Sequence, residues 1–131
     1  MVCPTSNAEQ NFSTAVIVED EKVLSEAYKL VLERVGYEVE VFSNGREALD
    51  HFDTHTPNFV LLDLHLPEVS GDAIIDSLKA NPDFDNTRIF LATADSRLGR
   101  HNETKADAVL IKPIGLQLLQ NLAFRYLPQT S

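Results

Sequence analysis

Residues 59–71 read FVLLDLHLPEVSG, and this stretch decides the fold. Its first four residues are large and apolar, and Asp63 follows them directly. A short apolar run that ends abruptly in an acid is typical of a buried strand with a polar group at its carboxyl end. Pro67 and Gly71 then mark a loop before the next helical pattern. The stretch therefore predicts a buried strand over 59–62 that ends at Asp63.

Strand-like runs and helical patterns alternate on both sides of this stretch. The other candidate strands lie at 15–18, 38–42, 89–92 and 108–111. Apolar residues at helical spacing occupy 23–35, 46–52, 74–78 and 115–126, with a weaker candidate at 96–105. Parallel strands need crossover connections, so this alternation favours a parallel sheet covered on both faces.

Five such units are too few for a closed eight-stranded barrel, which leaves an open α/β sheet. We expect a doubly wound five-stranded parallel sheet with the flavodoxin-like strand order 2-1-3-4-5 and helices on both faces. In that order the carboxyl ends of the first and third strands are neighbours. A ligand is expected to bind between those two ends.

Three helical segments can be described further. The first should end at Gly36 and turn one apolar stripe to the sheet, made of Val23, Leu24, Ala27, Leu30, Val31 and Val35. The second should have Ser43 or Asn44 as its N-cap, with Glu47 placed for a capping box. The segment 96–105 contains Gly99 and Asn102, so any helix there should be short and weakly docked.

Polar residues follow the strands and should meet at one edge of the sheet. Adjacent strands lie about 4.8 Å apart, so Glu19 and Asp20 after the first strand should converge with Asp63 after the third. Three packed carboxylates repel one another, and the arrangement is stable only with a cation among them. Mg²⁺ fits best, because it takes one or two carboxylates together with phosphate oxygens. Thr93 and Lys112 end the fourth and fifth strands and bring a hydroxyl and an ammonium to the same rim.

This combination of groups is suited to one reaction. A carboxylate nucleophile, a metal, an ammonium and a hydroxyl are the equipment for receiving a phosphoryl group on an aspartate. No general base is required, because a carboxylate is already ionised at pH 7. Asp63 is therefore the candidate acceptor.

Over 15–127 the sequence resembles the receiver domains of two-component response regulators. Four motifs carry the resemblance: VIVEDE with Glu19 and Asp20, LLDLHLPEVSG with Asp63, LATAD with Thr93, and LIKP with Lys112 and Pro113. The resemblance implies a signalling domain, and not an enzyme, that accepts a phosphoryl group on Asp63. The donor it implies is a sensor histidine kinase or a histidine phosphotransfer protein.

The resemblance also implies how the acidic residues hold Mg²⁺. Asp20 and Asp63 would bind the ion directly, and the backbone carbonyl of His65 would be the third protein ligand. Glu19 would act through water or hydrogen bonds. The side chain of His65 would tune the access of water to the acyl phosphate.

Around the phosphoryl group, the resemblance implies that Lys112 and Thr93 contact its oxygens and that the bond before Pro113 is a candidate cis peptide. Two positions depart from the family. Val109 stands where receivers commonly carry the aromatic switch residue, and Lys105 stands where a Gly is common. These departures do not change the residues expected for phosphorylation. They count against the family's usual output through its fourth helix, fifth strand and fifth helix. A phosphorelay intermediate is therefore expected as well as a stand-alone phospho-switch.

Three other functions match the sequence less well. A haloacid-dehalogenase-like phosphatase also uses an aspartate nucleophile and Mg²⁺, but it needs a second Asp two residues later, where this chain has His65. A flavin-binding carrier of the same fold would need a phosphate-binding loop in place of the acids at 19–21. A non-phosphorylated, docking-only receiver would not need the full set of acids, threonine and lysine.

Composition limits the classes of partner. The chain has 131 residues and a formal net charge of -9 at pH 7, so no direct binding to nucleic acid or membrane is expected. No apolar run approaches the roughly 20 residues needed to cross a bilayer. Cys3 is the only cysteine, which suits a reducing cytoplasm. We expect a cytoplasmic domain over 14–128, a flexible tail at 1–13 and a short tail at 129–131.

The last helical pattern is apolar around well over half of its circumference, through Leu116, Leu118, Leu119, Leu122, Ala123, Phe124, Tyr126 and Leu127. One sheet cannot bury all of these side chains. The helix is therefore either unusually well buried at its C-terminal end or carries a face for a partner or a homodimer. The histidines at 51, 55 and 101 lie in polar contexts without metal-ligand spacing and are expected on the surface.

Overall fold

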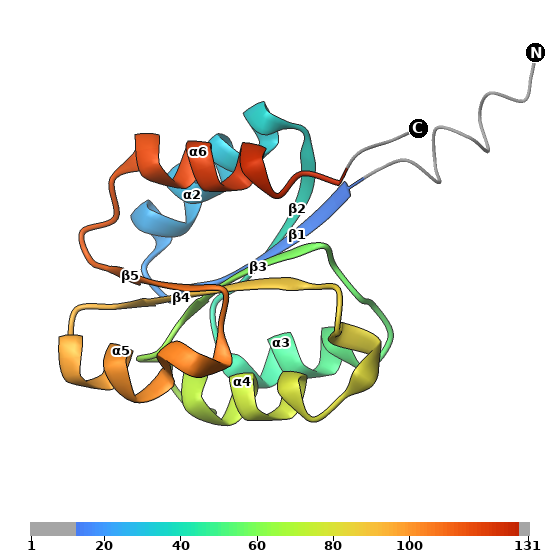
Figure 1. The fold of residues 1–131 in the computed structure, drawn as a ribbon, viewed down its shortest axis with the longest axis vertical. Helices are drawn as coiled ribbons and strands as arrows, with labels where there is room; N and C mark the ends of the chain where they lie inside the picture. Colours follow the sequence, from blue (N-terminus) through green and yellow to red (C-terminus); the bar gives the residue numbers. More distant parts are fainter. Residues whose placement is uncertain (1–12, 129–131) are drawn as a thin grey trace, which may run out of the picture.

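Five parallel strands form one sheet in the order β2-β1-β3-β4-β5, in a computed structural model that describes residues 13–128. The strands are β1 (Ser13–Val18), β2 (Tyr37–Phe42), β3 (Phe59–Asp63), β4 (Arg88–Thr93) and β5 (Ala108–Ile111). Figure 1 shows two helical layers around the sheet. One holds α2 (Lys22–Val35) and α6 (Leu116–Arg125), and the other holds α3 (Gly45–Phe52), α4 (Gly71–Lys79) and α5 (Ser96–Asn102). The predicted doubly wound sheet and its strand order are confirmed.

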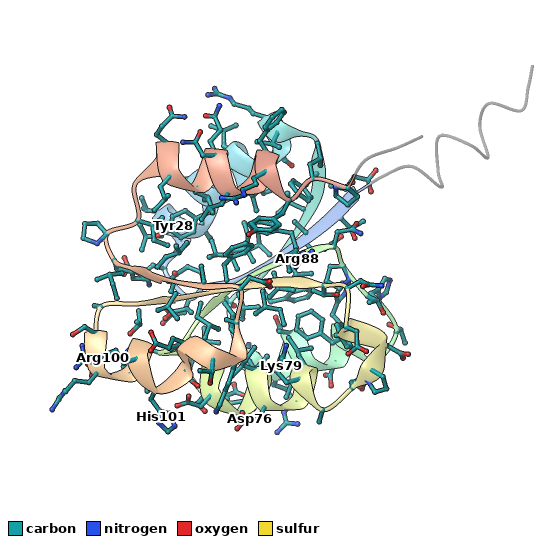
Figure 2. All side chains as sticks on the ribbon, in the orientation of Figure 1. Tyr28, Asp76, Lys79, Arg88, Arg100 and His101 are labelled. Carbon is teal, nitrogen blue, oxygen red and sulfur yellow. The ribbon has the colours of Figure 1, made fainter. Side chains whose placement is uncertain are left out.

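The sheet separates two apolar cores, which explains the continuous apolar runs of its central strands. Successive side chains of a strand point to opposite faces. In β1, Ala15 and Ile17 pack in the core under α2 and α6, together with Tyr28, whose side chain lies between α2 and the sheet (Figure 2). Val16 and Val18 pack in the other core, under α3 and α4. A strand buried on both faces needs apolar residues at every position.

The first strand, β1, begins one residue before the predicted start of the domain. Ser13, which the sequence analysis placed in the tail, is the first residue of β1 and pairs in register with Tyr37 of β2. Parallel pairing with β2 therefore extends the strand beyond its apolar run. The remainder of the predicted N-terminal tail and the predicted tail at 129–131 lie outside the described residues.

The apolar stripe predicted for α2 is wrong in part. Val23 and Leu30 are 77% and 50% exposed, whereas Ser25, Tyr28 and Leu32 form the buried face. Tyr28 is buried in the core that α2 forms with the sheet. The helix is consequently turned so that a polar residue, Ser25, is buried and two aliphatic residues face solvent.

The weak docking predicted for 96–105 is also wrong, although the helix is short as expected. Gly99 and Asn102 of α5 are buried. A Cβ atom on residue 99 would lie 2.9 Å from Val109 Cγ1 and 3.3 Å from Thr93 Cγ2. The glycine was interpreted as a helix weakener, but here the lack of a side chain lets α5 approach β4 and β5 closely. Lys105, after the helix, pairs with Asp76 of α4 at 2.8 Å.

The N-cap predicted for the second helical segment is confirmed. Asn44 is the N-cap of α3, and its side chain accepts a hydrogen bond from the Glu47 amide at 2.9 Å.

In α6, Leu119 and Ala123 are fully buried against the sheet and α2. Leu116, Leu118 and Phe124 remain exposed on that helix.

Tyr37 ties the edge strand β2 to α6, and its removal should change both stability and its pH dependence. Its hydroxyl donates to the Ala123 carbonyl at 2.9 Å. Tyr37→Phe should lower the free energy of unfolding by about 1 kcal/mol, because it leaves that buried carbonyl unpaired. Burial also raises the pKa of Tyr37 from 10.0 to about 12.

The sign of the pH effect follows from this raised pKa. The folded protein keeps the phenol proton in a range where the unfolded chain has released it. The stability contributed by the neutral phenol is complete below pH 10 and is lost as the pH rises through about 12. Urea unfolding measured at several alkaline pH values should show a steeper loss in the wild type than in Tyr37→Phe. Equal slopes would contradict this role of the phenol.

Candidate functional site

Three carboxylates meet at the carboxyl edge of the sheet. Val18 pairs with Leu62 in the parallel register of β1 and β3, so Glu19 and Asp63, one residue further on each strand, lie side by side. One carboxylate oxygen from each of Glu19, Asp20 and Asp63 lies within 4.8 Å of the others. Glu19 and Asp63 are buried, and Asp20 is exposed. The structure therefore brings together the three acids that were expected to converge.

Lys112 crosses to this cluster from the end of β5. Its Nζ lies 2.9 Å from Glu19 Oε1 and 3.1 Å from Asp63 Oδ2. Its backbone amide donates to the Thr93 carbonyl at 2.8 Å, which fixes the start of the side chain beside β4. The Lys112–Pro113 peptide bond is cis. One ammonium thus bridges two buried carboxylates from separate strands.

The electrostatics of the cluster leave an excess of negative charge. Burial raises the pKa of Glu19, the hydrogen bond from Lys112 opposes this, and the nearby charge of Asp63 adds to the rise. Burial pulls the pKa of Lys112 down, but its contacts with Glu19 and Asp63 outweigh this and the net effect is a raised pKa. A single ammonium faces three carboxylates, so the donor set suits a further hard cation.

The second oxygen of Asp63 is held by the loop that follows it. The His65 amide donates to Asp63 Oδ1 at 2.8 Å, while the side chain of His65 is exposed. Gly71 starts α4 against the end of β3, where a Cβ atom would lie 2.5 Å from the Asp63 carbonyl oxygen and 2.6 Å from Leu64 Cα. Only glycine allows this approach, and it keeps the loop over Asp63 compact. From the sequence, Gly71 was predicted only to mark a loop, because residue type and spacing carry no signal for this close packing.

Thr93 is fully buried at the end of β4, and its hydroxyl points to the next turn. It accepts a hydrogen bond from the Asp95 amide at 3.0 Å. Val109, the position without the usual aromatic residue, is half-buried and packs beside Gly99. Thr93 and Val109 therefore both lie next to α5, on the side of the sheet away from α6.

The order of the strands and the acids at their carboxyl edge define an α/β domain of the receiver type. A family model described as "Response regulator receiver domain" matches residues 15–124. The chain belongs to this family. Its members are signalling domains that interact with histidine kinases or phosphotransfer proteins, and they typically bind Mg²⁺ at an acidic pocket.

Relatives with known names support this membership. The polar-differentiation response regulator DivK of Brucella anthropi is 32% identical over 106 residues, which cover 79% of this chain and 86% of DivK. The transcriptional regulatory protein TrcR of Mycobacterium tuberculosis is 33% identical over 106 residues, but the match spans 41% of TrcR and 79% of this chain.

A solved structure shows the same fold. The signal receiver domain of a signal transduction histidine kinase from Syntrophus aciditrophicus is 33% identical, with a TM-score of 0.78. The match covers 88% of this chain and 89% of that one. Among the described residues of this chain, no helix is both long and apolar enough to cross a membrane.

Proposed function

We propose that Asp63 accepts a phosphoryl group from the phosphohistidine of a sensor histidine kinase or a histidine phosphotransfer protein, in the cytoplasm. The observation that carries the proposal is the pair of contacts on Asp63. Lys112 Nζ holds one carboxylate oxygen at 3.1 Å, and the His65 amide holds the other at 2.8 Å. These contacts orient an ionised carboxylate whose neighbours can also stabilise the charge of a phosphoryl group.

The same proposal includes Mg²⁺ as the cofactor. Asp20, Asp63 and the backbone carbonyl of His65 would hold the ion, and Glu19 would act through water or hydrogen bonds. The close approach of the three carboxylates, with Asp20 open to solvent, supports this assignment. When bound, Mg²⁺ supplies positive charge against the phosphoryl oxygens.

The residues of the chain then have separate tasks in the transfer. A carboxylate oxygen of Asp63 forms a bond to phosphorus while the bond from phosphorus to the donor imidazole nitrogen breaks, and that nitrogen keeps the electron pair. Lys112 can turn from the carboxylates to the phosphoryl oxygens, because the acyl phosphate leaves less charge on Asp63. The hydroxyl of Thr93 donates to the Asp95 carbonyl at 3.4 Å and would redirect that hydrogen to a phosphoryl oxygen, while its oxygen can still accept from the Asp95 amide.

Small phosphodonors test the proposal directly. The protein incubated with acetyl phosphate or phosphoramidate and Mg²⁺ should gain one phosphoryl group by intact mass, and EDTA should prevent the gain. The adduct should be labile to base, as expected of an acyl phosphate. Rapid multiple turnover of a phosphomonoester would instead support the haloacid-dehalogenase-like alternative, and no adduct under any condition would support a docking-only receiver.

We further propose that phosphorylation serves either a switch or a phosphorelay, with at most slow self-dephosphorylation. A switch requires partner affinity to differ between the two states. The exposed Leu116, Leu118 and Phe124 of α6 are the proposed contact for a protein partner or a second copy. Light scattering with and without beryllofluoride should show a change in oligomeric size if α6 forms a homodimer in the activated state.

A further inference from the structure

A pair of stacked histidines lies at the C-terminal end of α3, and neither belongs to the acidic cluster. The rings of His51 and His55 have centroids 4.2 Å apart and an interplanar angle of 4°. The His55 amide donates to the His51 carbonyl at 3.0 Å, so helical geometry continues past the last residue of α3. The two residues are therefore one turn apart on the same face. From the sequence, these histidines were predicted to lie on the surface without metal-ligand spacing, and their stacking depends on the helical turn that continues past Phe52.

The hydrogen bonds of His55 determine which of its nitrogens is free. Its Nδ1 lies 2.8 Å from Thr54 Oγ1 and 3.3 Å from the His51 carbonyl oxygen. Both contacts are made by Nδ1, so among the described residues Nε2 has no hydrogen-bond partner and is open to a metal ion. Histidines that bind metals commonly engage their other ring nitrogen in this way.

A carboxylate from the edge strand faces the same place. The ring of Phe42 lies 4.9 Å from the ring of His51. Glu40 is two residues before Phe42 on β2, so its side chain points to the same face of the sheet. Glu40 is exposed and lines one cavity of about 900 Å³ together with His51 and His55.

The charge of this cavity favours a cation. Its charged lining residues are Glu33, Glu38 and Glu40, and no lysine or arginine is among them. Three carboxylates without a basic side chain attract a positively charged ion to the imidazoles.

We propose that His51, His55 and Glu40 form a second metal site that binds a borderline divalent transition metal such as Zn²⁺. Two imidazoles and one carboxylate, with water in the fourth position, are a common tetrahedral ligand set for Zn²⁺. Zn–N bonds of about 2.0–2.1 Å place two ligand nitrogens about 3.4 Å apart. The nearly parallel rings must therefore rotate until both nitrogens point to one ion, which the exposed side chain of His55 allows. The bound ion would join the end of α3 to the edge strand β2.

The ligand chemistry separates this site from the acidic cluster. Imidazole selects Zn²⁺, Ni²⁺ or Cu²⁺, whereas an all-oxygen site suits Mg²⁺. The two sites should therefore bind different ions at once, and excess Mg²⁺ should block the acidic cluster without displacing Zn²⁺ from the histidines.

Competition with a chromophoric chelator tests the site. Untagged protein in excess Mg²⁺ is titrated with Zn²⁺, and the wild type should bind one equivalent. His55→Ala and His51→Ala should each weaken binding at least tenfold, and Glu40→Gln by a smaller factor. His101→Ala is the matched control, since His101 is exposed on α5, in another part of the molecule (Figure 2). His65→Ala controls for Zn²⁺ at the acidic cluster.

His55→Ala is the decisive variant, because His55 is exposed while His51 packs against Phe42 and its loss could disturb the fold. Circular dichroism should show an unchanged fold for His55→Ala, and added Zn²⁺ should raise the melting temperature of the wild type but not of this variant. Wild-type Zn²⁺ affinity in His55→Ala would overturn the proposal, as would binding that is lost in Asp63→Asn or His65→Ala. Phosphorylation of His55→Ala should equal that of the wild type, so the two proposals fail independently.

Discussion

Asp63→Asn should abolish phosphorylation by small phosphodonors while leaving the protein folded. The amide has no ionised oxygen to attack phosphorus, and no other described acid is held by both Lys112 and the loop amide of His65. Incubation with acetyl phosphate and Mg²⁺, followed by intact mass, should show no adduct in the variant. We expect at least a hundredfold loss of labelling rate, on the scale of removing a nucleophile.

Stability distinguishes a loss of chemistry from a loss of structure in this variant. The charge of Asp63 contributes to raising the pKa of Glu19, so the two buried carboxylates repel each other in the metal-free protein. Asp63→Asn removes that repulsion and leaves Lys112 paired with Glu19 at 2.9 Å. Its free energy of unfolding without Mg²⁺ should be equal to or higher than that of the wild type. Asp50→Asn, at an exposed position of α3, is the control and should label normally. Full labelling of Asp63→Asn would identify another acceptor.

Lys112→Met should destabilise the metal-free protein by about 3 kcal/mol. The side chains of Glu19 and Asp63 are only 2% and 4% exposed, and Lys112 is their shared partner. Removing one partner of a buried ion pair leaves an uncompensated charge, which is the costly part of the change. Urea unfolding in EDTA measures the effect. Lys29→Met, on the exposed side of α2, is the matched control and should unfold like the wild type.

Mg²⁺ should reverse much of this destabilisation. Without the competing ammonium, the carboxylates should bind the ion about tenfold more tightly, and ligand binding to the folded state raises its stability. Phosphorylation should nevertheless be slow, because no ammonium remains to contact the phosphoryl oxygens. An equal loss of stability with and without saturating Mg²⁺ would show that Lys112 acts through packing and not through its charge.

The strands and the acidic site could be predicted because both depend on local sequence. A strand buried on two faces must be apolar throughout, so the runs around Val16, Leu61 and Leu91 were recognisable one at a time. Glu19, Asp63 and Lys112 each follow such a run directly, and the topology rules for alternating units then place the ends of the strands at one edge. Their convergence needed no knowledge of side-chain contacts.

The buried face of each helix was less predictable, because a side chain on a helix is buried or exposed according to what packs opposite it. Val23 and Leu30 are as apolar as Leu32, yet Tyr28 and Ser25 take the inner face of α2. Gly99 weakens a helix by intrinsic propensity but permits a close approach of α5 to Val109. Propensity scales describe the isolated segment, and packing overrides them.

The sequence by itself determined the order of the elements, the apolar strands and the acids and lysine that follow them, since these are set by residue type and spacing along the chain. Tertiary structure alone decided that Lys112 bridges Glu19 and Asp63, that Thr93 is held by Asp95, and that His51 and His55 stack beside β2. The lysine bridge depends on side-chain directions between segments that are distant in the chain, and the other two contacts depend on local side-chain geometry. Periodicity carries no information about either.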